Sequence, residues 1–405
     1  MSKMQLGVIY GSRTCEHDVS IISAVQLMRS ADREKYDVIP VYISRKGEWF
    51  TGPALMDMDT YAHFDPFMKG IIPVRLDVTP GSGALIHYAP PKGLFGGGKE
   101  ETVARLDCVI PVMHGLHGED GSLQGMLELA DLPYASSGVA PSAVGMDKIV
   151  MKRFFKAFDF PILPDCALTR AQWEKDRDQA IAMVEEKLPY PVFVKPACLG
   201  SSIGVSPAKD REALKEALDL AFSYDRRALV EQGLDKPIEV NCSVLGYDGD
   251  RRASVLEMSN TGAGFLDFAD KYLPDHGQSK GMASLKRIVP APIGEELTKE
   301  LQNLSMKIFD AMDCKAVVRI DYMIDRISGK YYITEINTIP GSLAFYLWQP
   351  TGLPYPRLID EMVACAMKAH EEKHRNSYAF TSDILSGVRF GGKTGGKLGG
   401  KLGAK

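Results

Sequence analysis

The sequence AVVRIDYMIDRISGKYYITEINTIPG, at residues 316–341, decides the fold of this chain. Two apolar, β-branched runs, Ala316–Ile324 and Tyr331–Ile336, flank a short break that contains Gly329. A break of this kind between two such runs predicts a β-hairpin. Side chains of a strand alternate between its two faces, so the polar and apolar residues of each run are expected to separate.

The alternation gathers polar side chains on one face of the predicted hairpin. Arg319 and Asp321 share that face on the first strand, and Glu335 and Asn337 share it on the second. If the turn centres near Ser328, Asp321 lies opposite Glu335, and Arg319 lies opposite Asn337. The residues that point the other way, into a core, are Ile320, Tyr322 and Ile336.

This polar face suits a phosphate held by Mg²⁺, which takes oxygen ligands and usually combines few protein groups with substrate phosphates. Arg319 adds a forked donor for a phosphoryl oxygen. Taken alone, the Arg-x-Asp pattern is more often a charged outer face. The second strand favours the phosphate site, because Glu335 and Asn337 alternate with apolar residues and lead to Gly341, where a backbone can approach a ligand closely.

Composition restricts the class of protein. The 405 residues are 45% hydrophobic and 25% charged, which is typical of a globular chain with two or three domains, and the net charge of -4 argues against a general nucleic-acid binder. Seven widely spaced cysteines without a Cys-x-x-Cys pair indicate reduced thiols rather than a disulfide framework. The start resembles no signal peptide, and no apolar run reaches the length of a membrane span. We expect a soluble, cytoplasmic enzyme.

The chain opens with a predicted strand, glycine turn and helix. Met4–Tyr10 is an apolar run, and Val19–Met28 has the apolar spacing of a helix. Such a turn presents ligands at the carboxyl end of a parallel strand. The motif between them, GSRTCEHDVS at residues 11–20, crowds Glu16 against the helix start. Capping of the helix is the simpler explanation for these residues taken alone.

Another motif follows a strand in the same part of the chain. We predict strands at Tyr36–Ile43 and Leu106–Met113, with a surface insertion that contains short strands at residues 49–99. The second of these strands leads into HGLHGEDG at residues 114–121. Three glycines and four ionisable groups indicate a binding loop rather than a plain turn. His114 is the better functional candidate, because it directly follows the strand, although either histidine could be structural.

The middle of the chain carries a candidate phosphate loop. SSGVAPSAVGMDK at residues 136–148 leads into a predicted helix, and Tyr190–Pro196 is a predicted strand. Lys195 at the strand end can supply a point charge to a phosphate. The loop at residues 200–204, GSSIG, offers backbone N–H groups and hydroxyls to anionic oxygens, although the pattern is weak by itself. No Gly-Lys-Ser/Thr follows, so this is not a Walker loop.

Two later segments are less specific. A strand near Ala228–Val230 leads to EQGL at residues 231–234, which could pair with an adenine edge or could be a plain linker. The polar stretch at residues 264–281, with Lys271 and Tyr272 at its centre, is long for a connection and is a candidate lid. Amphipathic helices are predicted at Glu295–Met312 and Pro354–His374.

The last segment, from Gly391, repeats Gly-Gly-Lys and carries four lysines and no acid in fifteen residues. Low complexity of this kind predicts disorder. Without these four charges the body of the chain carries -8, so the tail is a small basic arm on an acidic protein. A solvated tail is the simpler interpretation, and weak contact with an acidic surface or a membrane is the alternative.

Taken together, these segments resemble the D-alanine–D-alanine ligase family of the ATP-grasp superfamily. The resemblance runs in order from Gly11 to about Pro350 and is carried by GSRTCEHDVS, HGLHGEDG, SGVAPSAVGMDK, VKPACLGSSIGV, the Lys271-Tyr272 pair, RIDYM and EINTIPGS. It implies an α/β, three-domain ATP-grasp ligase that acts as a homodimer. The implied domains are a parallel-sheet α/β unit at 1–136 and α+β units at 137–231 and 232–375 that clamp ATP. The resemblance excludes the insertion and the tail, and composition predicts that the Gly/Lys-rich tail at 376–405 is disordered.

The resemblance also implies roles for individual residues. The implied ATP-binding residues are Lys148, Lys195, Ser202, Glu231, Gln232, Leu234, Glu239 and Lys271. The implied ligands of two Mg²⁺ (or Mn²⁺) ions are Asp321, Glu335 and Asn337. The implied catalytic residues are Glu16, Ser201, Tyr272, Arg319 and Gly341. The implied substrate-binding residues are His114, Ser342 and Tyr346.

The reaction that the family implies is ATP-dependent joining of two D-alanines through an acylphosphate, for peptidoglycan precursor synthesis, with mobile loops that exclude water. Many members have a serine where this chain has Tyr346, whereas Lys271-Tyr272 resembles the dipeptide-forming members. We therefore expect D-alanine as second substrate rather than D-serine, D-lactate or another amino acid. The alternatives are an ATP-grasp ligase with other substrates, and a non-catalytic nucleotide-binding protein, which would lack metal ligands that this chain retains.

Overall fold

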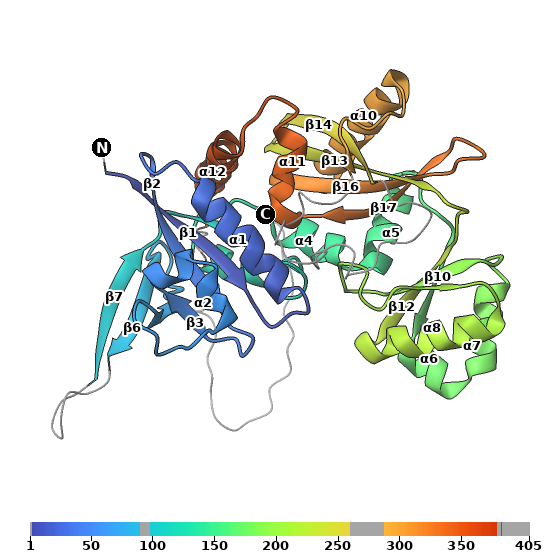
Figure 1. Cartoon of the computed structure of the whole chain (residues 1–405), viewed down its shortest axis with the longest axis horizontal. Helices are drawn as coiled ribbons and strands as arrows, with labels where there is room; N and C mark the ends of the chain where they lie inside the picture. Colours follow the sequence, from blue (N-terminus) through green and yellow to red (C-terminus); the bar gives the residue numbers. More distant parts are fainter. Residues whose placement is uncertain (1, 90–97, 260–286, 379–381, 383–405) are drawn as a thin grey trace, which may run out of the picture.

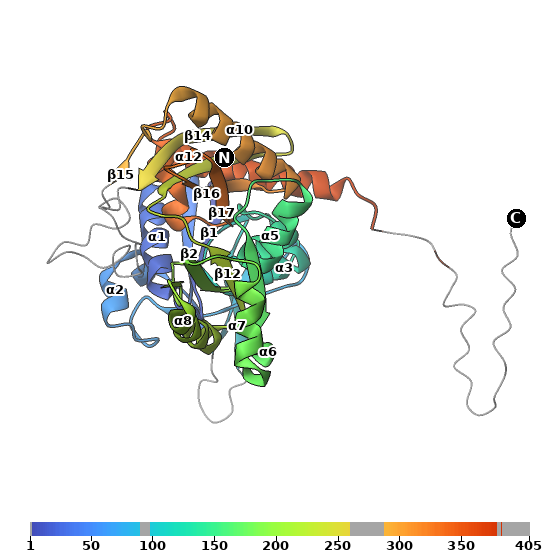
Figure 2. The ribbon, with the colours of Figure 1, turned by 90° about the vertical axis from the view of Figure 1, so that its right-hand side faces the viewer.

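The computed structural model describes residues 2–89, 98–259, 287–378 and 382. These residues form three main β-sheets that follow one another along the chain, with helices between and around them (Figure 1). Figure 2 views the same arrangement from the side and shows α12 and α1 close together. The predictions for Lys271, Tyr272 and the Gly/Lys repeats from Gly391 concern residues outside the described ranges.

The first sheet has the strand order β4-β3-β2-β1-β8. Three neighbouring strands, β1 (Met4–Gly11), β2 (Tyr36–Ile43) and the edge strand β8 (Cys108–Val112), are parallel, as the strand-turn-helix prediction requires, and α1 (His17–Ser30) connects the first two. Because β1 and β8 are neighbours, their carboxyl ends lie side by side. The loops that carry Glu16 and His114 therefore meet at one edge of this sheet.

The insertion at residues 49–99 contains short strands, as predicted, yet only part of it is a surface decoration. Its β3 (Trp49–Thr51) and β4 (Ile72–Pro73) extend the first sheet, and its Phe50 and Leu55 are buried in the core. The remaining elements of this region are η1 (Pro53–Met56), α2 (Asp59–Ala62), β5 (Arg75–Leu76), β6 (Ala84–Ala89) and β7 (Lys99–Arg105). β5, β6 and β7 form a separate three-stranded sheet, in which β7 extends past the predicted end of the insertion.

The second sheet is antiparallel, with the order β11-β10-β12-β9. Its strands are β9 (Asp165–Thr169), β10 (Val192–Pro196), β11 (Ser206–Ala208) and β12 (Arg227–Gln232). Its helices are α6 (Arg170–Lys175), α7 (Arg177–Glu185) and α8 (Arg211–Tyr224). Trp173, Val184 and Leu218 from the helices pack with strand residues in one core. Because the helices cover one face (Figure 1), the other face is available to ligands.

The third sheet has the order β15-β14-β13-β16-β17. Its strands are β13 (Ile238–Tyr247), β14 (Asp250–Ser259), β15 (Arg287–Ile288), β16 (Ala316–Ile324) and β17 (Tyr331–Asn337). The predicted hairpin is confirmed: Arg319 pairs with Asn337 and Asp321 with Glu335, while the register shifts after Asp321. Ile320, Tyr322 and Ile336 are buried, and α10 (Glu295–Ala311) packs on the same core.

The helices between the sheets join the parts of the chain. α3 (Ser122–Leu129) follows the HGLHGEDG loop, and α4 (Val139–Met146) and α5 (Lys148–Ala157) lead to the second sheet. Met151 and Phe155 of α5 nevertheless pack in the core of the third sheet. After β17, η3 (Gly341–Ala344) and α11 (Phe345–Trp348) lead to α12 (Tyr355–His374), whose Leu358 and Met362 share a core with the first sheet. None of the helices in the described ranges is long and apolar enough to cross a membrane.

Candidate active site

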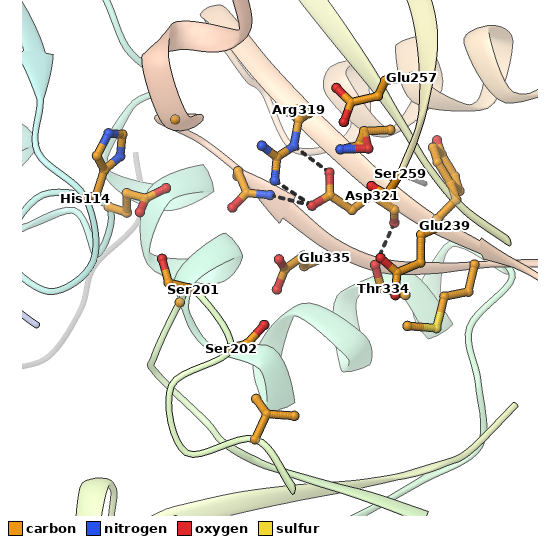
Figure 3. A pocket seen from close by; sticks show the side chains of 18 of the residues that line it. His114, Ser201, Ser202, Glu239, Glu257, Ser259, Arg319, Asp321, Thr334 and Glu335 are labelled. Atoms are coloured by element: carbon orange, nitrogen blue, oxygen red, sulfur yellow. Dashed lines mark hydrogen bonds and ion pairs between the residues drawn. The ribbon is translucent and has the colours of Figure 1, made fainter. Parts of the chain in front are cut away.

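A pocket opens where the three sheets approach one another, and thirteen residues predicted from the sequence line it. They are Glu16, His114, Lys148, Lys195, Ser201, Ser202, Glu239, Arg319, Asp321, Glu335, Asn337, Gly341 and Tyr346. The close view in Figure 3 shows the hairpin residues on one side and the serines of the GSSIG loop on the other. Motifs more than 300 residues apart in the sequence thus meet in one cavity.

The hairpin supplies a hydrogen-bonded group of side chains to the pocket. The Arg319 guanidinium donates two hydrogen bonds to the Asp321 carboxylate, Nε to Oδ1 and Nη2 to Oδ2, each 2.7 Å long. Asn337 Nδ2 donates to the same Asp321 Oδ2 at 3.1 Å. The two strands therefore fix these side chains through their register, because cross-strand partners on one face of a sheet are neighbours.

The donor set of this face fits a divalent metal. Asp321, Glu335 and Asn337 offer two carboxylates and an amide oxygen, which are the hard oxygen ligands that Mg²⁺ prefers. Lys148 Nζ lies 3.4 Å from Glu335 Oε2, so a cation already faces this carboxylate. The arrangement of acids around a cleft with two nearby lysines is suited to hold a metal-bound phosphate.

Lys148 is placed by the start of α5. Asp147 caps this helix by accepting hydrogen bonds from the N–H groups of Ile149 and Val150, so Lys148 is its first residue. The Lys148 ammonium donates to the Leu199 carbonyl at 2.7 Å, next to the GSSIG loop. The helix cap thus directs one cation from α5 into the space between the GSSIG loop and β17.

Lys195 belongs to a buried charge cluster. Its ammonium pairs with Glu231 on the neighbouring strand β12, and Lys152 of α5 pairs with the other oxygen of the same carboxylate. Burial opposes the charge of Glu231, yet the two lysines lower the pKa of this carboxyl to about 2. Glu231 is thus an anion that holds Lys195 at the pocket wall.

Glu16 lies at the opposite end of the pocket, at the start of α1. Its carboxylate accepts a hydrogen bond from the Ser201 hydroxyl of the GSSIG loop. Two glycines make room for it: a Cβ at Gly115 would lie 2.5 Å from Glu16 Oε2, and a Cβ at Gly200 would lie 2.8 Å from it. The three signature loops therefore meet around one carboxylate, and a side chain at either glycine would force that carboxylate to move.

His114 has a positioning role that its sequence context does not reveal. Its Nδ1 donates to the Ile339 carbonyl at 3.1 Å, since a carbonyl can only accept, and its Nε2 accepts from the Ser23 hydroxyl at 3.0 Å. Ser23 Oγ in turn accepts from the backbone N–H of Ser342 at 3.1 Å. Burial lowers the pKa of His114 to about 4, so the ring is neutral near pH 7. His114 thus ties the segment after β17 to α1.

The part of the pocket around Tyr346 carries two arginines. The Tyr346 hydroxyl accepts from Arg319 Nη1 at 3.3 Å, and the Arg287 guanidinium lies over its ring, 4.0 Å from the centroid. Arg287 Nη1 also pairs with Glu257 Oε2 at 3.3 Å. Burial raises the pKa of Glu257. This end of the pocket therefore presents two guanidinium groups around a phenol, which suits a bound carboxylate.

Four predicted residues within the described ranges do not line the pocket. Glu231 lies behind Lys195, and Gln232 and Leu234 follow it at the end of β12. The Ser342 hydroxyl is buried and donates to Gln26 Oε1 at 2.8 Å. The predicted roles of these residues, like those of Lys271 and Tyr272, stay predictions.

Sequence reasoning missed four charged residues of the site: Lys152, Glu119, Glu257 and Arg287. Glu119 lies within the HGLHGEDG motif and accepts from the N–H of Gly115 at 2.9 Å; burial, with the nearby Glu16 charge, raises its pKa to about 8. The motif itself could have indicated Glu119. Lys152, Glu257 and Arg287 carry no such signal, because only the packing of their elements brings them to the site.

The fold and the pocket define an ATP-grasp ligase. The family model described as D-ala D-ala ligase N-terminus matches residues 5–137, and the one described as D-ala D-ala ligase C-terminus matches residues 154–364. The chain belongs to the D-alanine–D-alanine ligase family.

Individual relatives agree over nearly the full length. The chain is 34% identical over 386 residues to the D-alanine–D-alanine ligase of Natranaerobius thermophilus (94% of this chain, 100% of the relative) and 37% identical over 382 residues to that of Bacillus cytotoxicus (93% and 99%). Among solved structures it resembles the VanG D-Ala:D-Ser ligase of Enterococcus faecalis, with a TM-score of 0.74 and 27% identity (90% of this chain, 100% of that chain). It also resembles the D-alanine-D-alanine ligase of Coxiella burnetii, with a TM-score of 0.72 and 25% identity (92% and 98%).

Proposed function

We propose that this chain joins two D-alanine molecules into D-alanyl-D-alanine and converts ATP to ADP and phosphate, for peptidoglycan precursor synthesis. The observation that carries the proposal is that the Glu16–Ser201 pair, Lys148 and the acidic face of the β16–β17 hairpin meet in one pocket. A carboxylate is a poor electrophile, so the γ-phosphoryl group of ATP first passes to the carboxylate of one D-alanine. The amine of the second D-alanine then attacks the carbonyl carbon, loses a proton and displaces phosphate.

The phosphate end of the pocket would be formed by basic residues from two elements. Lys148 and Lys195 lie on the pocket wall, and the Glu231 carboxylate holds Lys195 in place. Asp321, Glu335 and Asn337 would hold two Mg²⁺ (or Mn²⁺) ions, which when bound neutralise charge on the phosphates. The other residues proposed to contact ATP are Ser202, Gln232, Leu234, Glu239 and Lys271.

The donor D-alanine would bind beside Glu16. The Glu16 carboxylate, oriented by Ser201, is the natural partner of the donor ammonium group, and Tyr272 is proposed to join this network. The neutral His114 ring would hold the Ile339–Ser342 segment at the correct distance from α1. The Arg319 guanidinium and the Gly341 backbone would then stabilise the oxyanion that forms during attack.

The acceptor D-alanine would bind at the Tyr346 end. Its carboxylate would meet the Tyr346 hydroxyl and the guanidinium groups of Arg319 and Arg287. The same charges would accept D-serine or D-lactate, and the Enterococcus faecalis relative is a D-Ala:D-Ser ligase. A different acceptor is therefore the second candidate. A homodimer and a cytoplasmic location remain part of this proposal.

Two measurements on purified protein test the proposed function. With ATP, Mg²⁺ and D-alanine, mass spectrometry should identify D-alanyl-D-alanine, and added hydroxylamine should trap the acylphosphate as D-alanyl hydroxamate. Glu335→Gln should abolish both products, whereas Glu296→Gln, an exposed change on α10, should leave them unchanged. If hydroxamate forms but D-alanyl-D-alanine does not, and D-serine or D-lactate gives a ligated product, then D-alanine is the donor but not the acceptor. No hydroxamate from the wild-type protein would contradict the proposed reaction.

A further inference from the structure

A second cluster of ligating side chains lies outside the pocket, at the ends of α3 and α12. It comprises Asp131, which follows α3, and His370 and His374 on α12. One potential ligand atom from each residue lies within 4.8 Å of the others. None of these residues lines the pocket described above, so the proposed ligation reaction does not use them.

The two imidazoles converge on one carboxylate. His370 and His374 are four residues apart on one helix, which places both rings on the same face. His374 Nε2 lies 2.9 Å from Asp131 Oδ2 and 3.0 Å from Oδ1, and His370 Nε2 lies 3.3 Å from Oδ1 and 3.1 Å from the Asp131 backbone carbonyl oxygen. The ring centroids are 4.2 Å apart. Two Nε2 atoms and a carboxylate oxygen thus face a common point from two elements.

A lysine competes for the same point. Lys373 Nζ lies 3.3 Å from Asp131 Oδ1 and 2.7 Å from Glu128 Oε2. The cluster therefore has two explanations, a hydrogen-bonded ion network or a metal site in which Lys373 turns wholly to Glu128. The second is available because Glu128 also accepts from the Tyr134 hydroxyl, at 2.7 Å, and stays anchored when Lys373 moves.

We propose that Asp131, His370 and His374 bind a divalent transition metal of the Zn²⁺ class, with water in the remaining coordination position. A pair of histidines spaced i, i+4 on a helix, with a carboxylate, is a donor set that Zn²⁺ accepts in tetrahedral geometry. Two imidazoles select Zn²⁺, Ni²⁺ or Co²⁺ over Mg²⁺, which prefers oxygen ligands. The site is partly open, because the His374 side chain is 47% exposed. This is a site separate from the proposed metal site of the hairpin.

The consequence of binding would be structural. Asp131 and His370 are 239 residues apart, and α3 begins beside the HGLHGEDG loop whereas α12 packs against the third sheet. In Figure 2 the red end of α12 and α3 lie on the same side of the molecule. A bound metal would fasten these two helices, so it should raise the temperature of unfolding.

Zn²⁺ titration of the tag-free, full-length protein in excess Mg²⁺ tests the site, because Mg²⁺ occupies oxygen-ligand sites such as the hairpin. Zn²⁺ binding is measured by calorimetry, and Co²⁺ is used as an absorbance probe of tetrahedral geometry. His374→Ala, at a half-exposed position, should weaken Zn²⁺ binding by about tenfold or more, as should His370→Ala. His63→Ala, an exposed histidine outside the cluster, is the matched control.

Lys373→Met separates the two explanations. In a metal site it removes a competing cation and keeps all three ligands, so Zn²⁺ affinity should rise by about threefold or more, on the order of a lost charge repulsion near the surface. In a plain ion network the cluster holds no Zn²⁺, so neither the wild type nor Lys373→Met should bind it there. Equal Zn²⁺ binding by the wild type, His374→Ala and His63→Ala, or no binding by the wild type, would overturn the proposal, and neither result depends on ligase activity.

Discussion

Replacing Lys152 with methionine should destabilise this protein far more than its position outside the pocket lining suggests. The Lys152 side chain is fully buried on α5, where its ammonium pairs with Glu231 and donates to the Leu163 carbonyl at 3.3 Å. Methionine keeps the unbranched apolar stem but has no charge. The variant therefore leaves the buried Glu231 carboxylate with Lys195 as its remaining lysine partner.

The expected loss is about 3 kcal/mol at pH 7, because removing one partner from a buried ion pair typically costs about 3–5 kcal/mol and Lys195 keeps part of the compensation. The pKa of Glu231 supports this size. Although burial opposes its charge, the two lysines hold the pKa at about 2, below the ordinary 4.5. At about 1.4 kcal/mol for each unit of pKa, ionisation of Glu231 beside both lysines contributes about 3 kcal/mol, so the loss expected for one lysine is of the same order.

The pH dependence has a definite sign. A carboxyl group whose folded pKa lies below its unfolded pKa contributes stability that is present above about pH 4.5 and is lost as the pH falls towards about 2. In Lys152→Met one of the two lysines that lower the pKa of Glu231 is gone, while burial still raises it. The pKa of Glu231 therefore rises, and the carboxylate can take up a proton at higher pH. The difference in stability between wild type and variant should therefore be largest near pH 7 and should shrink towards pH 4.

Urea unfolding followed by tryptophan fluorescence measures the effect, since the protein has three tryptophans. Lys156→Met is the matched control, because Lys156 is an exposed lysine of the same helix. Its loss should stay within about 0.5 kcal/mol. If Lys152→Met and Lys156→Met unfold at the same urea concentration, or if their difference does not change with pH, the buried charge cluster is not stabilising in the way described.

Three further predictions concern the pocket. Gly200→Ala should raise the KM of the donor D-alanine by about tenfold in steady-state assays, because its Cβ would lie 2.8 Å from Glu16 Oε2; an unchanged KM would contradict the close packing. Arg287→Met and Tyr346→Phe should lower dipeptide formation while hydroxamate formation persists, and equal losses in both assays would remove them from the acceptor end. The raised pKa of Glu119, about 8, means that the folded state keeps a proton from about pH 4.5 to 8 that the unfolded state releases, so wild-type stability falls as pH rises through this window. Glu119→Gln should flatten that slope in thermal unfolding from pH 5 to 8, and an unaltered slope would refute this assignment.

The sequence by itself determined the elements with strong local periodicity. The hairpin register, with Asp321 opposite Glu335, followed from alternation and from the length of the turn, both of which are local properties. The parallel pair β1 and β2, joined by α1, followed in the same way from a strand, a glycine turn and a helix. The same patterns indicated that the loops that carry Glu16 and His114 lie at the carboxyl ends of parallel strands, where ligands bind.

Only the tertiary structure decided which charges pair in and behind the wall of the pocket. Lys152 and Glu231 are 79 positions apart, on a helix and on a strand of another sheet, and no periodicity links them. α5 packs in the core of the third sheet although it precedes the second, and Arg287 reaches Tyr346 from an edge strand. Local alternation fixes which face of an element a side chain occupies, but the partner of a buried charge depends on how whole elements pack, because burial makes every unpaired charge costly.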